Sequence, residues 1–153
     1  MEPRDAKLLA LKPTFSATVQ IGCKPTKAWN YVKHLDTWPT WNKHATRVDG
    51  KCELGAKATL WVTGRKGPGS IPETGVWVEV AEDSRMVFRS KWLWFDYLYV
   101  WTICEAKAAD ACTVSYSCHG SGLGVGCVGA VLRRRHQRLM AESLANLKKI
   151  MEC

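Results

Sequence analysis

The sequence predicts an α+β fold in which a curved, seven-stranded antiparallel sheet wraps around one long C-terminal helix. Two observations predict this fold. Apolar residues recur with the two-residue period of strands over most of the chain, and the last thirty residues, Leu123 to Cys153, have the apolar period of a helix. The 153 residues are 46% hydrophobic, which is enough apolar material for one domain core.

The first part of the chain predicts one strand and two short helices. We expect residues 1–13 to be an extension, either a short amphipathic turn or a frayed end, to which no role is assigned, and residues 14–153 to form a single domain. Thr14 to Ile21 alternates apolar and polar side chains, as a half-buried strand does. Pro25 suits the first turn of a helix, and Leu35 to Asn42 predicts a second short helical segment. The inner face of the first helix is expected to carry Ala28, Trp29 and Val32.

Six further strands are predicted at 46–51, 56–63, 76–80, 86–92, 97–105 and 114–119. The 97–105 segment is apolar on both faces, which indicates a central strand. Between the third and fourth strands, Gly64 to Gly75 contains four glycines and two prolines, so it predicts a loop. We expect this loop to be a mobile lid whose Arg65 and Lys66 meet an acidic group of a ligand.

His136 and Ser143 are polar residues on the apolar face of the long helix, and they lie seven positions apart. A buried polar group without a partner costs about 1–3 kcal/mol, so an inward His136 needs a hydrogen bond. Tyr99, Tyr116, Ser143 or an oxygen of a ligand are the alternatives. Because the pKa of histidine lies near 6.5, roughly neutral, His136 also suits acid/base chemistry.

Composition and charge argue against several classes of protein. No stretch approaches the roughly 18 apolar residues of a membrane span, and the first residues lack the apolar core of a signal peptide, so we expect a cytoplasmic protein without stable membrane insertion. The seven cysteines are odd in number and scattered, which favours a reducing compartment. The net charge of +8 is spread along the chain, and its one run, Arg133 to Arg135, points three ways on a helix, so no nucleic acid partner is expected.

No motif predicts a metal or a cofactor. Cys118 and His119 lack further ligands at the spacing of a zinc finger. Gly124 to Gly129 matches G-x-G-x-x-G, but the chain ends too soon after it for the second parallel strand of a dinucleotide-binding fold. No catalytic triad, P-loop or pair of carboxylates is present.

Several segments together resemble a known superfamily. They are Val19 to Asn42 (VQIGCKPTKAWNYVKHLDTWPTWN), Gly55, Val76 to Val80 and the closing Leu144-x-x-Leu147-Lys148. This pattern is similar to the helix-grip (SRPBCC) superfamily, which includes START lipid-transfer domains, polyketide cyclase/dehydrase-like proteins and Bet v 1-like plant proteins. The resemblance implies a sheet wrapped around the last helix with a deep cavity between them. It carries no catalytic signature.

The expected cavity is lined by strand residues that face inward and by the apolar face of the helix. For the 97–105 strand, Tyr99 and Trp101 are expected to face inward, and Asp96 is the only acid expected near the cavity. The expected acid/base residues are His136, Tyr99, Tyr116 and Asp96. The expected ligand-binding residues are Leu60, Val62, Val78, Phe88, Trp92, Trp101, Leu132, Met140 and Ser143, and Val114 is a further wall residue.

Two functions from different classes remain open. The first is binding of a hydrophobic, aromatic, polyketide-like or lipidic small molecule, with affinity from apolar burial. The second is a polyketide cyclase, aromatase or dehydratase that uses His136 and a tyrosine as acid and base without a cofactor. The residues leave the ligand and the oligomeric state open, and a homodimer is one alternative.

Overall fold

The computed structural model describes residues 1–92, 95–122 and 125–153, and for Trp92 and residues 126–131 it describes the backbone alone. The helices are α1 (Pro3–Leu9), α2 (Pro25–Lys33), α3 (Trp38–Trp41) and α4 (Val125–Glu152), with the short 3-10 helix η1 (Leu35–Thr37) before α3. The strands are β1 (Phe15–Ile21), β2 (Ala45–Gly50), β3 (Lys57–Gly64), β4 (Gly67–Ala81), β5 (Arg85–Trp92), β6 (Phe95–Glu105) and β7 (Cys112–Gly122).

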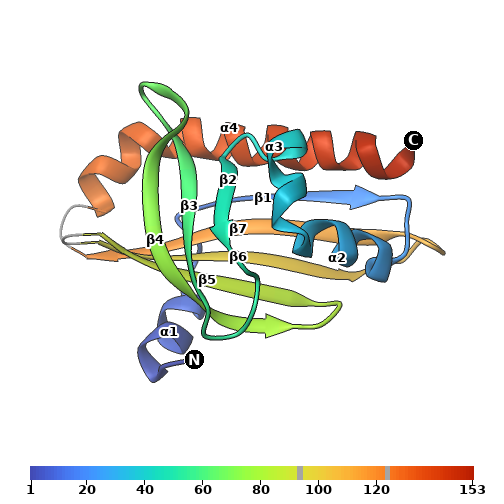
Figure 1. Ribbon diagram of the computed structural model, residues 1–153, viewed down its shortest axis with the longest axis horizontal. Coiled ribbons are helices and arrows are strands. Elements are labelled where there is room, and N and C mark those ends of the chain that lie inside the picture. Colours follow the sequence, from blue (N-terminus) through green and yellow to red (C-terminus); the bar gives the residue numbers. More distant parts are fainter. Residues whose placement is uncertain (93–94, 123–124) are drawn as a thin grey trace.

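The seven strands form one antiparallel sheet in the order β1-β7-β6-β5-β4-β3-β2, so β6 is near its centre. The sheet curls around α4, and α2 and α3 lie on the same side of it (Figure 1). This confirms the predicted α+β helix-grip fold. Among the described residues, no helix has both the length and the apolar character needed to cross a membrane. The G-x-G-x-x-G match at Gly124 to Gly129 lies largely outside the described residues.

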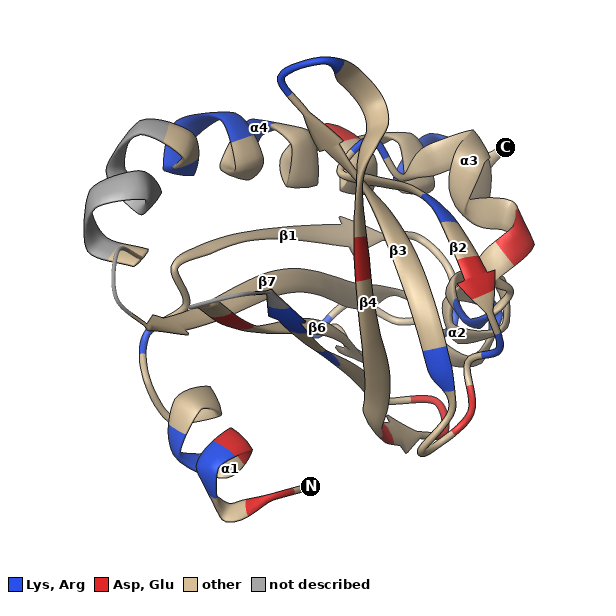
Figure 2. Cartoon of the chain, turned by 60° about the vertical axis from the view of Figure 1, so that its left-hand side comes forward, with Lys and Arg blue, Asp and Glu red and all other residues tan. Residues whose placement is uncertain are grey.

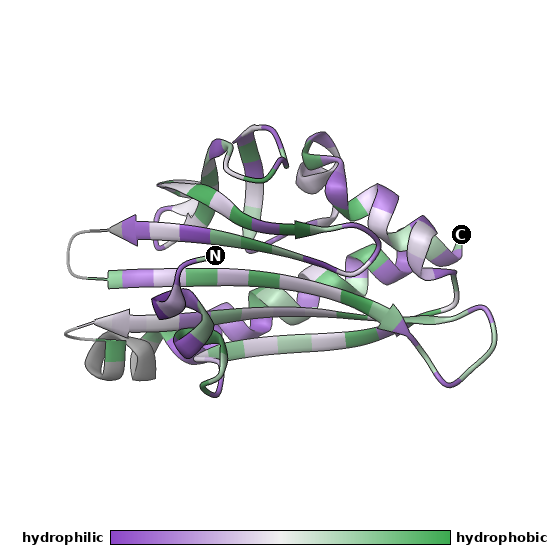
Figure 3. Ribbon diagram, turned by 90° about the horizontal axis from the view of Figure 1, so that it is seen from below, coloured by the Kyte–Doolittle hydropathy of each residue, from purple (hydrophilic) through white to green (hydrophobic). Residues whose placement is uncertain are grey.

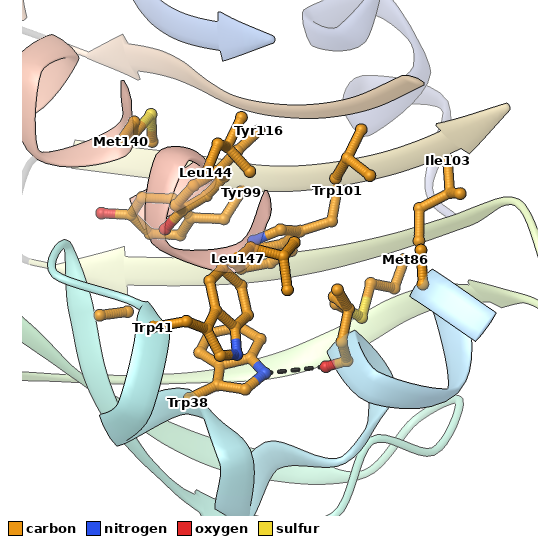
Figure 4. Packing of buried hydrophobic residues seen from close by; sticks show 14 of the residues in the cluster. Trp38, Trp41, Met86, Tyr99, Trp101, Ile103, Tyr116, Met140, Leu144 and Leu147 are labelled. Carbon is orange, nitrogen blue, oxygen red and sulfur yellow. Dashed lines mark hydrogen bonds between the residues drawn. The ribbon is translucent and has the colours of Figure 1, made fainter. Parts of the chain in front are cut away.

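The main core lies between the concave face of the sheet and the C-terminal half of α4. Five tryptophans are almost completely buried there, and Leu144 and Leu147 of α4 pack with them (Figure 4). Trp38 satisfies its indole N–H by donating to the carbonyl oxygen of Val32 at 2.8 Å. The long rigid rings fill the space between the sheet and this half of α4. The five tryptophans are Trp29, Trp38, Trp41, Trp77 and Trp101.

A second, smaller core lies on the outer face of the sheet, under α1 (Figure 3). Leu8 of α1 packs there against four apolar side chains of β4, β5 and β6. Arg89 of β5 forms ion pairs with the start of α1, with Glu2 at 2.8 Å and with Asp5 at 3.1 Å. Of the two alternatives for the extension, the structure therefore shows the ordered helical segment and not the frayed end. The four sheet residues are Val78, Val87, Leu98 and Val100.

The segment Gly64 to Gly75 is not the predicted loop. Gly64 ends β3 and the rest belongs to β4, where Ile71 pairs with Val62 and Glu73 pairs with Leu60. Only the turn at Arg65 and Lys66 connects the two strands. The prolines and glycines of this segment favoured a loop in the sequence analysis. From Gly67 to Thr74, however, β4 pairs with β3 alone, and a strand with one open edge tolerates proline. A lid formed by a mobile twelve-residue loop is excluded.

A register shift in β4 reverses the face predicted for Val78. The pairing of β4 with β5 shifts between Trp77 and Glu79, as in a β-bulge. Trp77 therefore points into the main core, and Val78 lies in the outer cluster beneath α1. The prediction that Val78 lines the cavity is wrong, because simple alternation does not survive an inserted residue.

Gly75 is expected to be intolerant of any side chain. A Cβ at this position would lie 2.1 Å from the carbonyl oxygen of Arg89 and 2.6 Å from the Phe88 ring. Backbone cannot retreat as a flexible side chain can, so Gly75→Ala should lower the free energy of unfolding by about 3 kcal/mol or more. Urea unfolding measures this change.

Gly22→Ala is the matched control, because its Cβ would meet only the flexible carboxylate of Glu152, at 3.3 Å. It should change the free energy of unfolding by less than about 0.5 kcal/mol. Equal losses in the two variants would contradict the packing described for β4.

Candidate functional site

A cavity of about 490 Å³ lies between the N-terminal half of α4 and the sheet. Its walls come from α4, from the start of β1 and β6, and from the first half of β4. They consist mainly of aromatic and aliphatic side chains, with a few polar groups among them, which is the usual composition of a small-molecule site. The lining residues are Thr14, Phe15, Ile71, Glu73, Phe95, Tyr97, Tyr99, Val125, Leu132 and His136.

One wall of the cavity is a row of three rings on β6. Alternate residues of a strand share a face, so Phe95, Tyr97 and Tyr99 project together. The ring centroids of Phe95 and Tyr97 are 6.1 Å apart and those of Tyr97 and Tyr99 are 6.2 Å apart, with interplanar angles of 15° and 29°. Another part of the lining holds Phe15 and His136, whose rings stack at 5.1 Å and 17°. The cavity is therefore bounded by nearly planar stacks of rings.

Glu73 is the acid of this cavity, and the sequence analysis missed it. It lies on β4 between Ile71 and Gly75, and its Oε2 accepts a hydrogen bond of 2.9 Å from the hydroxyl of Tyr99. Burial raises the pKa of the Glu73 carboxyl to about 7, although the hydrogen bond from Tyr99 and the nearby hydroxyl group of Ser90 act in the opposite direction. Near neutral pH this carboxyl can either donate or accept a proton.

His136 reaches the cavity from α4 and is joined to a chain of buried polar groups. Its Nδ1 lies 2.9 Å from Nε2 of His44, and Nδ1 of His44 lies 2.8 Å from the hydroxyl oxygen of Tyr116. Burial lowers the pKa of His136, with a smaller contribution from the charge of Arg135. Burial, and then the charge of His136, lower the pKa of His44 well below its ordinary value. Both imidazoles are therefore neutral near pH 7.

The segment between α3 and β2 holds His44 in place. Asn42 Oδ1 accepts from the backbone N–H groups of His44 at 3.1 Å and Ala45 at 2.8 Å. Ser143 of α4 accepts from the backbone N–H of Lys43 at 2.8 Å and from that of His44 at 3.2 Å, and its own hydroxyl donates to Leu139 O at 2.6 Å. Ser143 thus ties the His44 segment to α4 and does not line the cavity.

The expected site residues fall into three groups. Tyr99, Leu132 and His136 line the cavity. Trp92 has a side chain outside the described residues, and Asp96 lies on the outer side of β6, where it pairs with Arg4 of α1, so the expectation of an acid near the cavity is wrong for Asp96. The packed core contains Leu60, Val62, Phe88, Trp101, Val114, Tyr116, Met140 and the polar Ser143, each at most 1% exposed.

His44 is the second residue that the sequence analysis missed. It is fully buried, and it supplies the partner that was expected for His136. Of the protein groups considered from the sequence, Tyr99, Tyr116 and Ser143 form no direct hydrogen bond with His136, although Tyr116 reaches it through His44. The sequence does indicate a turn just before His44, because Asn42, a residue type that favours turns, lies two positions before it.

Positive charge lies outside the cavity and not within it. Figure 2 shows basic residues along α4 and at the tip of the β3–β4 hairpin. Arg133 donates from Nε to the carbonyl oxygen of Thr14 at 2.9 Å, and Arg135 donates to that of Gly64, so these two side chains join α4 to β1 and β3. The described residues hold no group of three or more side chains placed to bind a metal ion.

Comparison with known proteins identifies a family. A family model described as polyketide cyclase/dehydrase and lipid transport matches residues 12–152. Among curated proteins, no sequence match was found.

Solved structures share the fold at low sequence identity. A hypothetical protein of Helicobacter pylori has a TM-score of 0.77 at 11% identity, with 99% of this chain and 95% of that chain covered. The di-domain ARO/CYC StfQ from the steffimycin biosynthetic pathway has a TM-score of 0.70 at 14% identity, with 90% of this chain and 50% of that chain covered. A protein of Deinococcus radiodurans has a TM-score of 0.65 at 14% identity, with 90% and 96% covered. At these identities the likeness concerns the fold.

The raised pKa of Glu73 predicts a stability that depends on pH. The folded-state pKa of about 7 lies above the ordinary 4.5, so between these values the folded protein binds more protons than the unfolded chain. The free energy of unfolding should therefore fall as the pH rises through this range, by up to about 3 kcal/mol. Glu73→Gln removes the titrating group and should remove this part of the pH dependence.

Urea unfolding of wild type and Glu73→Gln from pH 4 to 8 measures the difference. The exposed Glu53→Gln serves as the control and should follow the wild type. If the wild type and Glu73→Gln lose stability in parallel, the carboxyl is not held protonated by burial.

Proposed function

Because the chain belongs to the polyketide cyclase/dehydrase and lipid transport family, we propose that it binds a hydrophobic small molecule, aromatic and polyketide-like or lipidic, in the cavity between α4 and the sheet. The family supports either binding of such a molecule or a cyclase role. The binding function rests on the cavity and needs no particular reaction.

The observation that carries this proposal is the aromatic lining of a cavity of about 490 Å³. Flat rings on β6 and the stacked pair of Phe15 and His136 suit a planar ligand, because aromatic rings pack favourably at the centroid distances seen here. A ligand that buries roughly 200 Å² of apolar surface gains about 5 kcal/mol before the cost of association is subtracted. His136 and Glu73 would fix its orientation.

A second candidate is a cyclase or dehydratase activity in the same cavity. The observation that favours it is the pair of Glu73 and His136, two titratable groups that line one apolar cavity. With its pKa near 7, Glu73 suits removal of a proton from a carbon beside a carbonyl group of a polyketide chain. His136 would hydrogen bond to the carbonyl oxygen as charge develops on it.

Filling the cavity should weaken binding. A hydrophobic naphthalene dye is expected to quench the tryptophan fluorescence of the native protein saturably, and Leu132→Trp should weaken this binding at least tenfold, because the larger ring occupies the ligand's volume. Ile150→Trp is the matched control, since Ile150 lies on the same helix, is 38% exposed and does not line the cavity. Native mass spectrometry of the purified protein would identify a retained ligand. Quenching that never saturates would contradict the proposal.

The effect of His136→Ala separates the two candidates. For a carrier, the variant loses one hydrogen bond to the ligand, and the affinity should fall by roughly 0.5–1.5 kcal/mol. For an enzyme, turnover of a poly-β-ketone chain should fall by roughly a hundredfold or more while the affinity changes as for the carrier. Glu73→Gln should reduce turnover in the same way. If His136→Ala changes neither affinity nor turnover, the residue has no role in the site.

A further inference from the structure

The two ring nitrogens of His44 are both engaged, one by Tyr116 and the other by His136. The distances are 2.8 Å from Nδ1 to the Tyr116 hydroxyl oxygen and 2.9 Å from Nε2 to His136 Nδ1. His44 and Tyr116 are completely buried. The hydroxyl hydrogen of Tyr116 and the ring hydrogen of His44 must therefore be accepted by other groups of the protein.

The hydroxyl of Tyr116 fixes the direction of the chain. The other polar side chain at this hydroxyl group is Asn42, which lowers the pKa of Tyr116, as an N–H donor does. Asn42 Oδ1 already accepts from the backbone N–H groups of His44 and Ala45, so His44 Nδ1 is the acceptor that the hydroxyl group contacts. If His44 donated instead, the hydroxyl hydrogen of Tyr116 would be buried without an acceptor, which is costly. Tyr116 therefore donates, and His44 Nδ1 accepts.

The position of the ring hydrogen of His44 follows from this direction. A neutral imidazole carries a single ring hydrogen, so His44, whose Nδ1 accepts, carries it on Nε2 and donates it to Nδ1 of His136. His136 Nδ1 is thereby an acceptor, and its ring hydrogen is on Nε2. Among the side chains and backbone groups that the structure describes, none is hydrogen bonded to that Nε2, and His136 lines the cavity.

We propose that His44 is a positioning residue that holds His136 as a neutral N–H donor facing the ligand, so that the cavity selects molecules with an acceptor oxygen, such as a ketone or a quinone, attached to an apolar ring system. The selection of ligand rests on the proposed binding function, whereas the state of His136 does not. Protonation of His136 would place a second ring hydrogen on its Nδ1, facing the Nε2–H of His44. The hydrogen bonds between His136 and His44 and between His44 and Tyr116 would then both have to reverse direction.

The other charged and titratable groups around His136 are few. Arg135 on α4 is the neighbouring cation, and it disfavours a charged imidazole, as burial does. His44 approaches from the segment between α3 and β2, and it is neutral. The remaining titratable groups of the cavity come from β4 and β6, namely Glu73, Tyr97 and Tyr99.

The test that needs no ligand is nitrogen NMR of the histidine rings. In the ¹⁵N-labelled wild type, His136 should carry its hydrogen on Nε2, and its pKa should lie below the ordinary value of roughly 6.5. His44→Phe removes the donor, so the pKa of His136 should rise and both tautomers should appear. His44→Gln keeps an N–H donor at the position of Nε2 and should behave more like the wild type.

Tyr116→Phe distinguishes positioning from mere packing. It keeps the shape of the core but removes the hydroxyl that fixes His44, so the pKa of His136 should rise here too, with His44 still present. It also keeps the inference testable if His44→Phe does not fold. A wild-type His136 that is charged at neutral pH, that carries its hydrogen on Nδ1, or that does not respond to Tyr116→Phe would overturn the role of His44.

The ligand preference is tested with two probes of nearly equal shape, 2-acetylnaphthalene and 2-isopropenylnaphthalene, which differ by a carbonyl oxygen in place of a methylene group. The wild type and His44→Gln should bind the ketone roughly two- to tenfold more tightly, as one hydrogen bond allows. His136→Phe should bind both probes equally. Equal binding of both probes by the wild type overturns the selectivity. If neither probe binds at millimolar concentration, the proposed function fails, and the NMR result still decides the role of His44.

Discussion

The packing of α4 into the concave face of the sheet is the interaction on which the rest of this structure depends. Toward its C-terminal end, α4 buries Leu144 and Leu147 against tryptophan rings from α3 and β6, and the space there is filled. Toward its N-terminal end, the cavity of about 490 Å³ separates α4 from the rings of β6. One straight helix cannot follow a curled sheet along its whole length, so one end packs and the other end leaves space.

A line of buried polar groups links the filled end to the cavity. Ser143 and Asn42 hold the backbone at His44, and His44 joins Tyr116 to His136. Hydrogen bonding lowers the cost of burying polar groups, and here the bonds of Ser143 to the His44 segment, and of His44 to Tyr116 and His136, join different elements. The orientation of His136 in the cavity is therefore set by residues of the core and not by the cavity itself.

The interior and exterior of the site differ in charge. Near pH 7 the His136 ring is neutral and the Glu73 carboxyl is about half protonated, because burial lowers the pKa of His136 and raises that of Glu73 to about 7. The net charge of +8 is carried by side chains outside the cavity, including Arg133 and Arg135, which join α4 to β1 and β3. Because no lysine or arginine among the described residues lines the cavity, an apolar ligand can bind there without displacing water from a permanently charged side chain.

The sequence by itself determined the fold class, because the two-residue and 3.6-residue apolar periods are local properties of the chain. It also determined that His136 lies on the inner face of the last helix and that Tyr99 faces inward.

The sequence could not determine the partner of His136, since His44 is 92 positions away and the contact exists only once α4 closes on the sheet. Glu73 was hidden in a segment rich in glycine and proline, whose strand character comes from pairing with β3. The bulge beside Trp77 and the helix α1 likewise decided the environment of Val78. Which inward residues line the cavity and which fill the core was decided by tertiary structure alone, because an empty volume depends on the sizes of side chains from several elements at once.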